Sequence, residues 1–213
     1  VAVIADSSAD PRFIAADLLS QAEHGADSQV LLVTTDAALI DSVESEIENQ
    51  LSTLPRAETA RQALAESRLV LVRDLQQGFT IINRYAPEHL IIMTDDTARD
   101  AKLVINAGSV FLGDYSPESV GDYASGTNHI LPTDGYAARL SGVSLDSFVR
   151  KVTFQQLSRN GLDAVGSAVE IMARAEGLEA HASAAATRQG AIHAAFAPRR
   201  GRNRHGRVEV AAE

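Results

Sequence analysis

Gln21 and His24 are the first side chains along the sequence whose types and spacing could bind a metal ion. They lie three residues apart near the end of a predicted helix, so both face the same side, with Glu23 turned away. The chain contains no cysteine, and any metal must therefore be held by imidazole, carboxylate or amide groups. We expect this pair near the carboxyl edge of a sheet. A polar helix end without a ligand is the alternative interpretation.

Glu88 and His89 form an adjacent acid–base pair that follows Pro87. The proline favours an extended conformation at Ala86, which places the pair at a corner between a helix and a strand. A neutral imidazole can accept a proton, while a neighbouring carboxylate can activate water. The pair therefore indicates proton-transfer chemistry, although a solvated turn could have the same sequence.

A long polar segment, residues 113–135, supplies further candidate ligands. It is rich in Gly, Asp, Ser and Asn, and a loop of that length in a compact domain is usually functional. Asp122 could bind zinc through a carboxylate oxygen, and Asp114 and Glu118 are equally available carboxylates that spacing does not separate from it. His129 could contact a substrate carboxylate or could simply be exposed.

Glu176, Glu179 and His181 form a last cluster, at the end of a predicted late helix. Charged residues are also common where a helix ends. The cluster therefore permits a site without requiring one.

The elements that must position these residues alternate between strand and helix. Short apolar runs without clean alternation predict parallel strands covered on both faces. These runs are Val1–Ala5, Val30–Thr34, Leu69–Val72, Leu90–Met93 and Ser109–Leu112. Helices are predicted from Pro11 to a closing Gly25, from Asp36 to before Pro55, and over Thr59–Leu64, Leu75–Tyr85 and Thr97–Ile105. This alternation predicts an α/β fold, a Rossmann-like open parallel sheet layer that is incomplete.

A change of pattern near residue 143 predicts a domain boundary. We assign residues 1–143 to the second part of a Rossmann-like catalytic domain, residues 144–186 to a mainly helical tail domain, and residues 187–213 to a basic, disordered tail. In the tail domain, Ser158 is expected to cap a long helix that ends near Gly177.

The charge of the chain is unevenly distributed and restricts the possible partners. The net charge is −9, but residues 188–213 hold six arginines and two glutamates, hence +4, which leaves −13 for the preceding 187 residues. This negative charge on residues 1–187 disfavours nucleic-acid binding, which relies on Lys and Arg. No apolar run approaches the ~20 residues needed to span a bilayer. The absence of cysteine fits a reducing cytosol, and we expect a cytoplasmic protein without a membrane partner.

Four segments, in this order, make the sequence similar to the histidinol dehydrogenases, which catalyse the last step of histidine biosynthesis. They are QAEHG at 21–25, YAPEHL at 85–90, AGSVFLGDYSPESVGDYASGTNHILPT at 107–133 and EGLEAH at 176–181. The similarity runs from Val1 to about Ala185. It corresponds to roughly the second half of the chains in that family.

The resemblance implies a role for each matching position. Its implied zinc ligands, for one ion per site, are Gln21, His24, Asp122 and His181. His89 matches the general base for the substrate hydroxyl, and Glu88 matches the residue that activates water. The implied contacts to L-histidinol are Gln21, His24, His89, Asp122, His129, Glu176 and His181.

The resemblance also implies a reaction and an assembly. NAD oxidises L-histidinol to the aldehyde histidinal and then, through its hydrate, to L-histidine, while zinc orients the substrate. The family is a homodimer whose helical tail crosses to the other subunit. Residues 144–186 would then be a dimerisation domain, and Glu176 and His181 would complete the site of the partner.

Two departures limit the expected activity. The N-terminal half of the family supplies most NAD contacts, and no G-x-G-x-x-G or P-loop motif occurs here, so the cofactor-binding residues stay unassigned. Val1–Ala5 resembles a strand already under way, and we expect a missing upstream segment and an inactive isolated chain. From Thr187 onward the sequence does not match the family, which we interpret as a disordered or frame-shifted end. An inactive α/β module that binds a metal or a partner chain is the alternative function.

Overall fold

The computed structural model describes residues 1–196, with side chains as far as residue 193. These residues form two compact units, Val1–Arg150 and the part that begins at Lys151. The division falls seven residues after the predicted boundary.

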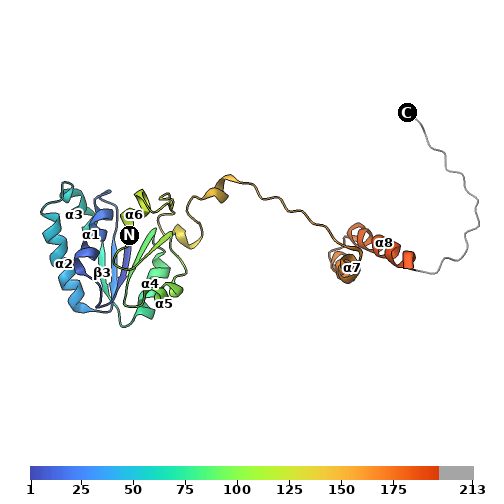
Figure 1. Cartoon of the computed structure of the whole chain (residues 1–213), viewed down its shortest axis with the longest axis horizontal. Coiled ribbons are helices and arrows are strands. Elements are labelled where there is room, and N and C mark those ends of the chain that lie inside the picture. The colour runs from blue at the N-terminus through green and yellow to red at the C-terminus, as the bar shows by residue number, and fades with distance from the viewer. Residues whose placement is uncertain (197–213) are drawn as a thin grey trace, which may run out of the picture. The chain divides into compact units, whose positions relative to one another are not determined.

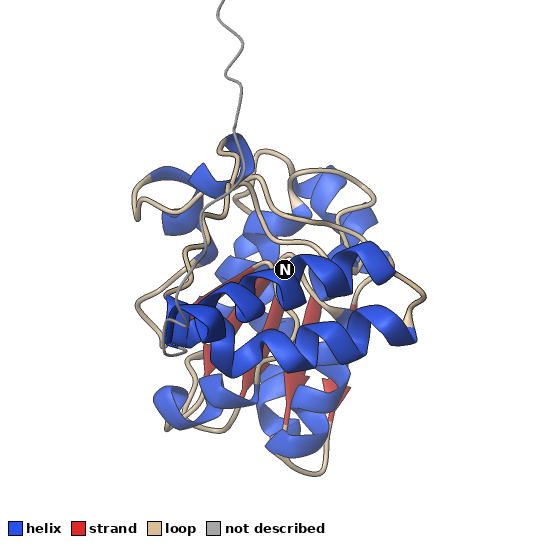
Figure 2. Cartoon of the chain, turned by 90° about the vertical axis from the view of Figure 1, so that its right-hand side faces the viewer, coloured by secondary structure: helices blue, strands red, loops and turns tan. Residues whose placement is uncertain are grey.

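Five parallel strands form the sheet of the first unit, which Figure 2 draws in red. The strands are β1 (Ala2–Ala5), β2 (Leu31–Thr34), β3 (Arg68–Leu71), β4 (His89–Met93) and β5 (Ser109–Leu112). Their order in the sheet is β3-β2-β1-β4-β5, and Ala2 is in register with Leu31 on one side and Leu90 on the other. The order reverses between β1 and β4, as in doubly wound α/β folds. The predicted open parallel sheet is confirmed.

Helices cover both faces of the sheet, because β1, β2 and β4 carry buried residues on both sides (Figure 1). One face is covered by α1 (Pro11–Ala22), α2 (Ala37–Leu51) and α3 (Ala57–Ala65). The other face is covered by α4 (Leu75–Tyr85), α5 (Thr97–Asp100) and the 3₁₀ turn η1 (Ala101–Leu103). Ile14 and Leu18 of α1 are fully buried in the first core, and Phe79 and Ile82 of α4 in the second.

Carboxylates fix where the main helices begin. Asp10, Asp36 and Asp74 each accept a hydrogen bond from a backbone N–H in the first turn, of α1, α2 and α4 respectively. The end of α1 was predicted less well: the helix ends at Ala22, and Gly25 does not have the positive φ of a C′ glycine. The predicted helix over 97–105 is divided into a single α-helical turn and a 3₁₀ turn.

The polar segment 113–135 contains a short helix that the sequence analysis did not predict. This helix, α6 (Glu118–Tyr123), follows β5, and the 3₁₀ turns η2 (Tyr136–Ala138) and η3 (Leu145–Phe148) come later. Six residues are too few for a periodic pattern to be visible in the sequence. The expectation of a continuous loop is therefore wrong at the position of Asp122.

The second unit is a pair of packed helices, α7 (Arg159–Ala175) and α8 (Glu179–Phe196). Ser158 caps α7 as predicted, by accepting a hydrogen bond from the N–H of Gly161, and Gly177 has a φ of 76° in the turn that follows. The described helix continues beyond Thr187 as far as Phe196, so the first ten residues of the predicted disordered tail are helical. The rest of that tail, residues 197–213, lies outside the described residues.

Candidate active site and metal site

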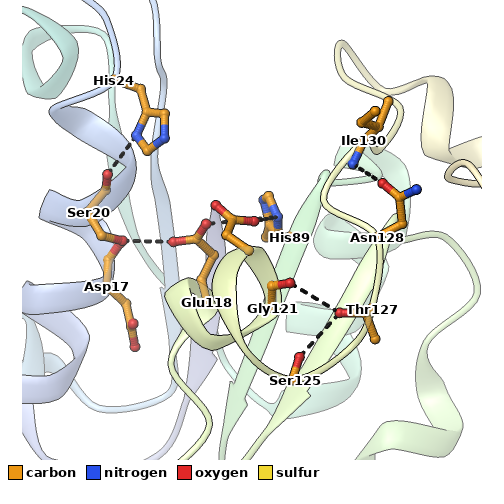
Figure 3. A network of polar contacts seen from close by, with 11 residues as sticks. Asp17, Ser20, His24, His89, Glu118, Gly121, Ser125, Thr127, Asn128 and Ile130 are labelled. Carbon is orange, nitrogen blue, oxygen red and sulfur yellow. Dashed lines mark hydrogen bonds and ion pairs between the residues drawn. The ribbon is translucent and has the colours of Figure 1, made fainter.

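The candidate site lies at the amino edge of the sheet, where α1 ends and β4 begins (Figure 3). His89 is the first residue of β4, while Gln21 and His24 belong to the last turn of α1 and the residues just after it. A helix that starts beyond the carboxyl end of a parallel strand runs back to the amino edge before the next strand. The predicted position near the carboxyl edge is therefore wrong, because α1 has returned the chain by the time it reaches Gln21.

The backbone just before His89 is held by the end of α4 and by the segment that leads into β5. Ala86 ends α4 in the left-handed region, with a φ of 51°, instead of the extended conformation predicted from Pro87. The carbonyl oxygen of Pro87 accepts a hydrogen bond of 2.9 Å from the N–H of Gly108. A Cβ atom at Gly108 would lie 2.5 Å from the carbonyl oxygen of Glu88. This close approach requires glycine at position 108, a signal that the sequence analysis missed.

His89 is a buried imidazole between two carboxylates. Its side chain is 6% exposed, and Nε2 lies 3.7 Å from Oδ1 of Asp122 and 3.9 Å from Oε1 of Glu118. Burial is the main cause that lowers the pKa of His89, to about 4. The ring is therefore neutral at pH 7 and has a lone pair that can accept a proton. The two carboxylates stand where they would stabilise the imidazolium ion formed by that step.

Glu118 and Asp122 are brought to His89 by α6. They are four residues apart and so lie on one face of this helix. Glu118 is 2% exposed, and Ser20 of α1 donates a hydrogen bond of 2.9 Å to its Oε2 atom. Burial, and then the neighbouring Asp122, raise the pKa of Glu118. A Cβ atom at Gly121 would lie 2.6 Å from the ring of Phe111, so glycine lets α6 approach β5.

Glu118 and Asp114 are equivalent candidates in the sequence, but the structure separates them. Asp114 is exposed in the turn after β5, and Glu118 is buried beside His89. The i, i+4 spacing of Glu118 and Asp122 was the available signal, but it has meaning only if the segment is helical.

Two buried atoms of this cluster could bind a metal ion. Nδ1 of His89 and Oδ1 of Asp122 have no hydrogen-bond partner among the described residues, and buried polar atoms in native proteins are normally satisfied. Within the described chain, one group of His and carboxylate side chains brings its ligand atoms within 4.8 Å of one another: His89, Glu118 and Asp122. An imidazole and carboxylate oxygens are donors that zinc accepts.

His24 is oriented for coordination, although it lies outside that group of three. Its Nδ1 atom is 2.8 Å from the carbonyl oxygen of Ser20. A carbonyl only accepts, so Nδ1 must carry the proton, and the Nε2 lone pair is left for a metal ion. A backbone carbonyl that accepts a hydrogen bond from the other ring nitrogen commonly orients a zinc-binding histidine.

A polar cavity of about 910 Å³ adjoins the site. Its lining includes Gln21, Tyr85, Glu88, Thr133 and Asp134. Burial raises the pKa of Glu88, which makes this carboxylate a stronger base than a solvated one. The cavity therefore places a predicted metal ligand and the predicted water-activating residue in one space that a small polar substrate could enter.

The remaining predicted residues are not brought to this cluster by the described contacts. His129 is exposed in the segment after α6. Glu176 caps the end of α7 and His181 lies in the first turn of α8, both exposed and both in the second unit. Their assignments remain predictions.

The fold and this cluster together define a class: a doubly wound α/β protein with a histidine–carboxylate site suited to binding a metal and transferring protons. A model of the family described as "Histidinol dehydrogenase" matches residues 1–189. The chain belongs to the histidinol dehydrogenase family.

Relatives agree with this assignment along most of the chain. Histidinol dehydrogenase of Bacteroides fragilis is 57% identical over 88% of this chain and 44% of its own length, and that of Salmonella typhimurium is 54% identical over 90% and 44%. A crystal structure of histidinol dehydrogenase from Elizabethkingia anophelis superposes with a TM-score of 0.84 at 51% identity, covering 90% of this chain and 44% of that one. The chain therefore spans less than half the length of these relatives. In the described part of the chain, no helix is long and apolar enough to cross a membrane.

Proposed function

We propose that this chain supplies the metal-binding and proton-transfer side of a histidinol dehydrogenase, an NAD-linked enzyme that oxidises L-histidinol through histidinal to L-histidine. The observation that carries the proposal is the neutral, buried His89 beside Glu88, with an unsatisfied oxygen of Asp122 facing its ring. Membership in the family supports an oxidoreductase of histidine biosynthesis. The alternative, an inactive module that binds a metal or a partner, has no specific observation in its favour.

In the first oxidation, His89 acts as the general base. As a hydride leaves the carbinol carbon for NAD, the hydroxyl proton passes to the neutral imidazole, and the carbon–oxygen bond becomes that of an aldehyde. The resulting imidazolium ion is stabilised by the carboxylates of Asp122 and Glu118 at 3.7 and 3.9 Å. The low pKa of His89 favours return of the proton to solvent before the second step.

In the second oxidation, Glu88 acts on water. Its carboxylate, whose pKa is raised by burial, takes a proton from a water molecule that adds to the aldehyde carbon. The hydrate then loses a second hydride to NAD and becomes the carboxylic acid. Glu88 lines the cavity, so water and substrate can reach it from the same space.

Zinc would be held by Gln21, His24, Asp122 and His181, and when bound it would orient the amine and imidazole of the substrate. In this proposal Glu176 and His181 act in the site of the partner subunit of a homodimer, and His129 contacts the substrate. The NAD contacts come from the part of the enzyme that precedes the matched region of the relatives. The proposed location is the cytoplasm.

Zinc stoichiometry tests the proposed metal site. We expect His24→Ala and Asp122→Ala each to abolish tight zinc binding, measured by equilibrium dialysis and elemental analysis. Asp114→Ala is the matched control, because it removes an exposed carboxylate from the same segment. Unchanged zinc content in both site variants would refute the ligand assignment.

Complementation tests the proposed reaction. The chain is mixed with a separately produced N-terminal part of the Bacteroides fragilis relative, histidinol and NAD. Formation of NADH supports a histidinol dehydrogenase. Its absence from folded, associated and zinc-loaded halves would favour the inactive module.

A further inference from the structure

Helix α6 is too short and too poorly capped to be stable by itself. It has six residues, and Pro117 at its N-cap offers no side-chain hydrogen bond. Isolated helices of this length are not stable in water. The helix that carries Asp122 must therefore be held by contacts from elsewhere in the fold.

Two buried or half-buried residues of α1 provide these contacts. The Asp17 carboxylate, which is 5% exposed, lies close to the backbone N–H of Glu118, at the start of α6. The Ser20 hydroxyl lies 2.9 Å from Oε2 of Glu118 and 2.8 Å from the carbonyl oxygen of Asp17, and its proton is shared between the two (Figure 3). The Ser20 hydroxyl of α1 thus ties the first residue of α6 to α1.

These contacts lie one helical turn before the predicted metal ligands on both helices. On α1, Gln21 and His24 follow Asp17 and Ser20 by four residues each, and on α6 Asp122 follows Glu118 by four. Residues four apart lie on the same face of a helix. Ser20 also accepts a hydrogen bond from Nδ1 of His24 through its backbone carbonyl, so one residue contacts both sides of the site.

We propose that Asp17 and Ser20 are positioning residues that hold α6 against α1 and thereby fix Asp122 relative to His24. The inference rests on the proposed metal site and adds to it the residues that set its dimensions. Neither residue binds the metal ion in this proposal. Removing a group that orients a metal ligand through a hydrogen bond typically changes metal affinity by about 10- to 100-fold.

Conservative variants separate positioning from a general loss of stability. Ser20→Ala removes the hydroxyl, whereas Ser20→Thr keeps it. Asp17→Ala removes the side chain that lies at the start of α6, whereas Asp17→Asn keeps a side chain of the same shape. Ser42→Ala is the matched control, since the exposed Ser42 of α2 donates its hydroxyl only to the carbonyl of Ala38 in its own helix.

The test measures the Zn²⁺ affinity of the whole chain by competition with a chelating dye, and records the visible absorption spectrum of the Co²⁺-substituted protein. We expect Ser20→Ala and Asp17→Ala to bind Zn²⁺ about 10-fold more weakly or worse, with an altered Co²⁺ spectrum. Ser20→Thr and Asp17→Asn should restore affinity and spectrum, and Ser42→Ala should change neither. A purely structural role would not alter the Co²⁺ spectrum of the folded fraction.

The outcomes distinguish this inference from the proposed function. If His24→Ala and Asp122→Ala abolish binding while Ser20→Ala and Asp17→Ala keep the affinity and spectrum of the unmodified chain, the positioning role is refuted and the metal site stands. If His24→Ala and Asp122→Ala bind normally, the metal site itself is wrong and the positioning role falls with it. Should Asp17→Ala fail to fold, Ser20→Ala decides alone.

Discussion

The substitution Asp17→Asn should remove a pH dependence from the free energy of unfolding of the first unit. Burial raises the pKa of Asp17 from 3.8 to about 7. Between these two values the folded chain holds a proton that the unfolded chain has released, so the free energy of unfolding falls as the pH rises. The whole loss corresponds to about 4 kcal/mol, since one pKa unit is about 1.4 kcal/mol. Above about pH 7 the loss is complete, and below about pH 4 it is absent.

Asp17→Asn has no proton to lose, and so this slope should disappear. The variant keeps the shape of the side chain but buries amide N–H groups, at a cost of about 1–3 kcal/mol. We therefore expect it to be less stable than the unmodified chain near pH 4 and of equal or greater stability near pH 8. The change of this stability difference with pH comes from the titration of Asp17 alone and does not depend on the absolute cost.

Urea denaturation in the presence of a chelator, followed by tyrosine fluorescence, measures the stability of the unit that contains Asp17, Val1–Arg150. The chain has no tryptophan, and all four of its tyrosines lie before Arg150. Asp41→Asn, on the exposed face of α2, is the matched control and should leave the pH profile unchanged. Parallel profiles for Asp17→Asn and the unmodified chain between about pH 4 and 7 would refute the reasoning.

Three further substitutions test the packing around the site, all by urea denaturation. Gly108→Ala places a Cβ atom 2.5 Å from the carbonyl oxygen of Glu88, and should cost about 1–3 kcal/mol, because a backbone atom cannot rotate away; unchanged stability would show that the approach is not tight. Phe79→Ala empties a site that is 1% exposed and should cost about 3–5 kcal/mol, so a loss below about 1 kcal/mol would contradict its place in the core. Ala86→Gly relieves a φ of 51° and should stabilise the chain by up to about 1 kcal/mol, whereas a loss of stability would argue against strain at that position.

The sheet and its large helices were predictable because their residues carry the pattern themselves. Runs such as Leu90–Met93 are apolar at every position, which fits a strand covered on both faces, and all five residues of β4 are buried. The aspartates that begin α1, α2 and α4 are ordinary capping residues that can be identified without a structure.

The geometry of the site was not predictable from local sequence, because it depends on contacts between distant segments. Helix α6 depends on Asp17 and Ser20, about 100 residues earlier in the chain. The proline rule predicts an extended Ala86, but the end of α4 forces this residue into the left-handed region. Glu118 could be told from Asp114 only when the fold buried one and exposed the other.

The most direct measurement of the central claim is NADH formation by a chimera. In this protein, the present chain replaces the matching C-terminal part of the Bacteroides fragilis relative, to which it is 57% identical. We predict that the chimera forms two NADH per L-histidinol in the presence of zinc, and that His89→Asn prevents this. A folded, zinc-binding chimera that forms no NADH from histidinol, or a His89→Asn variant with full activity, would contradict the account.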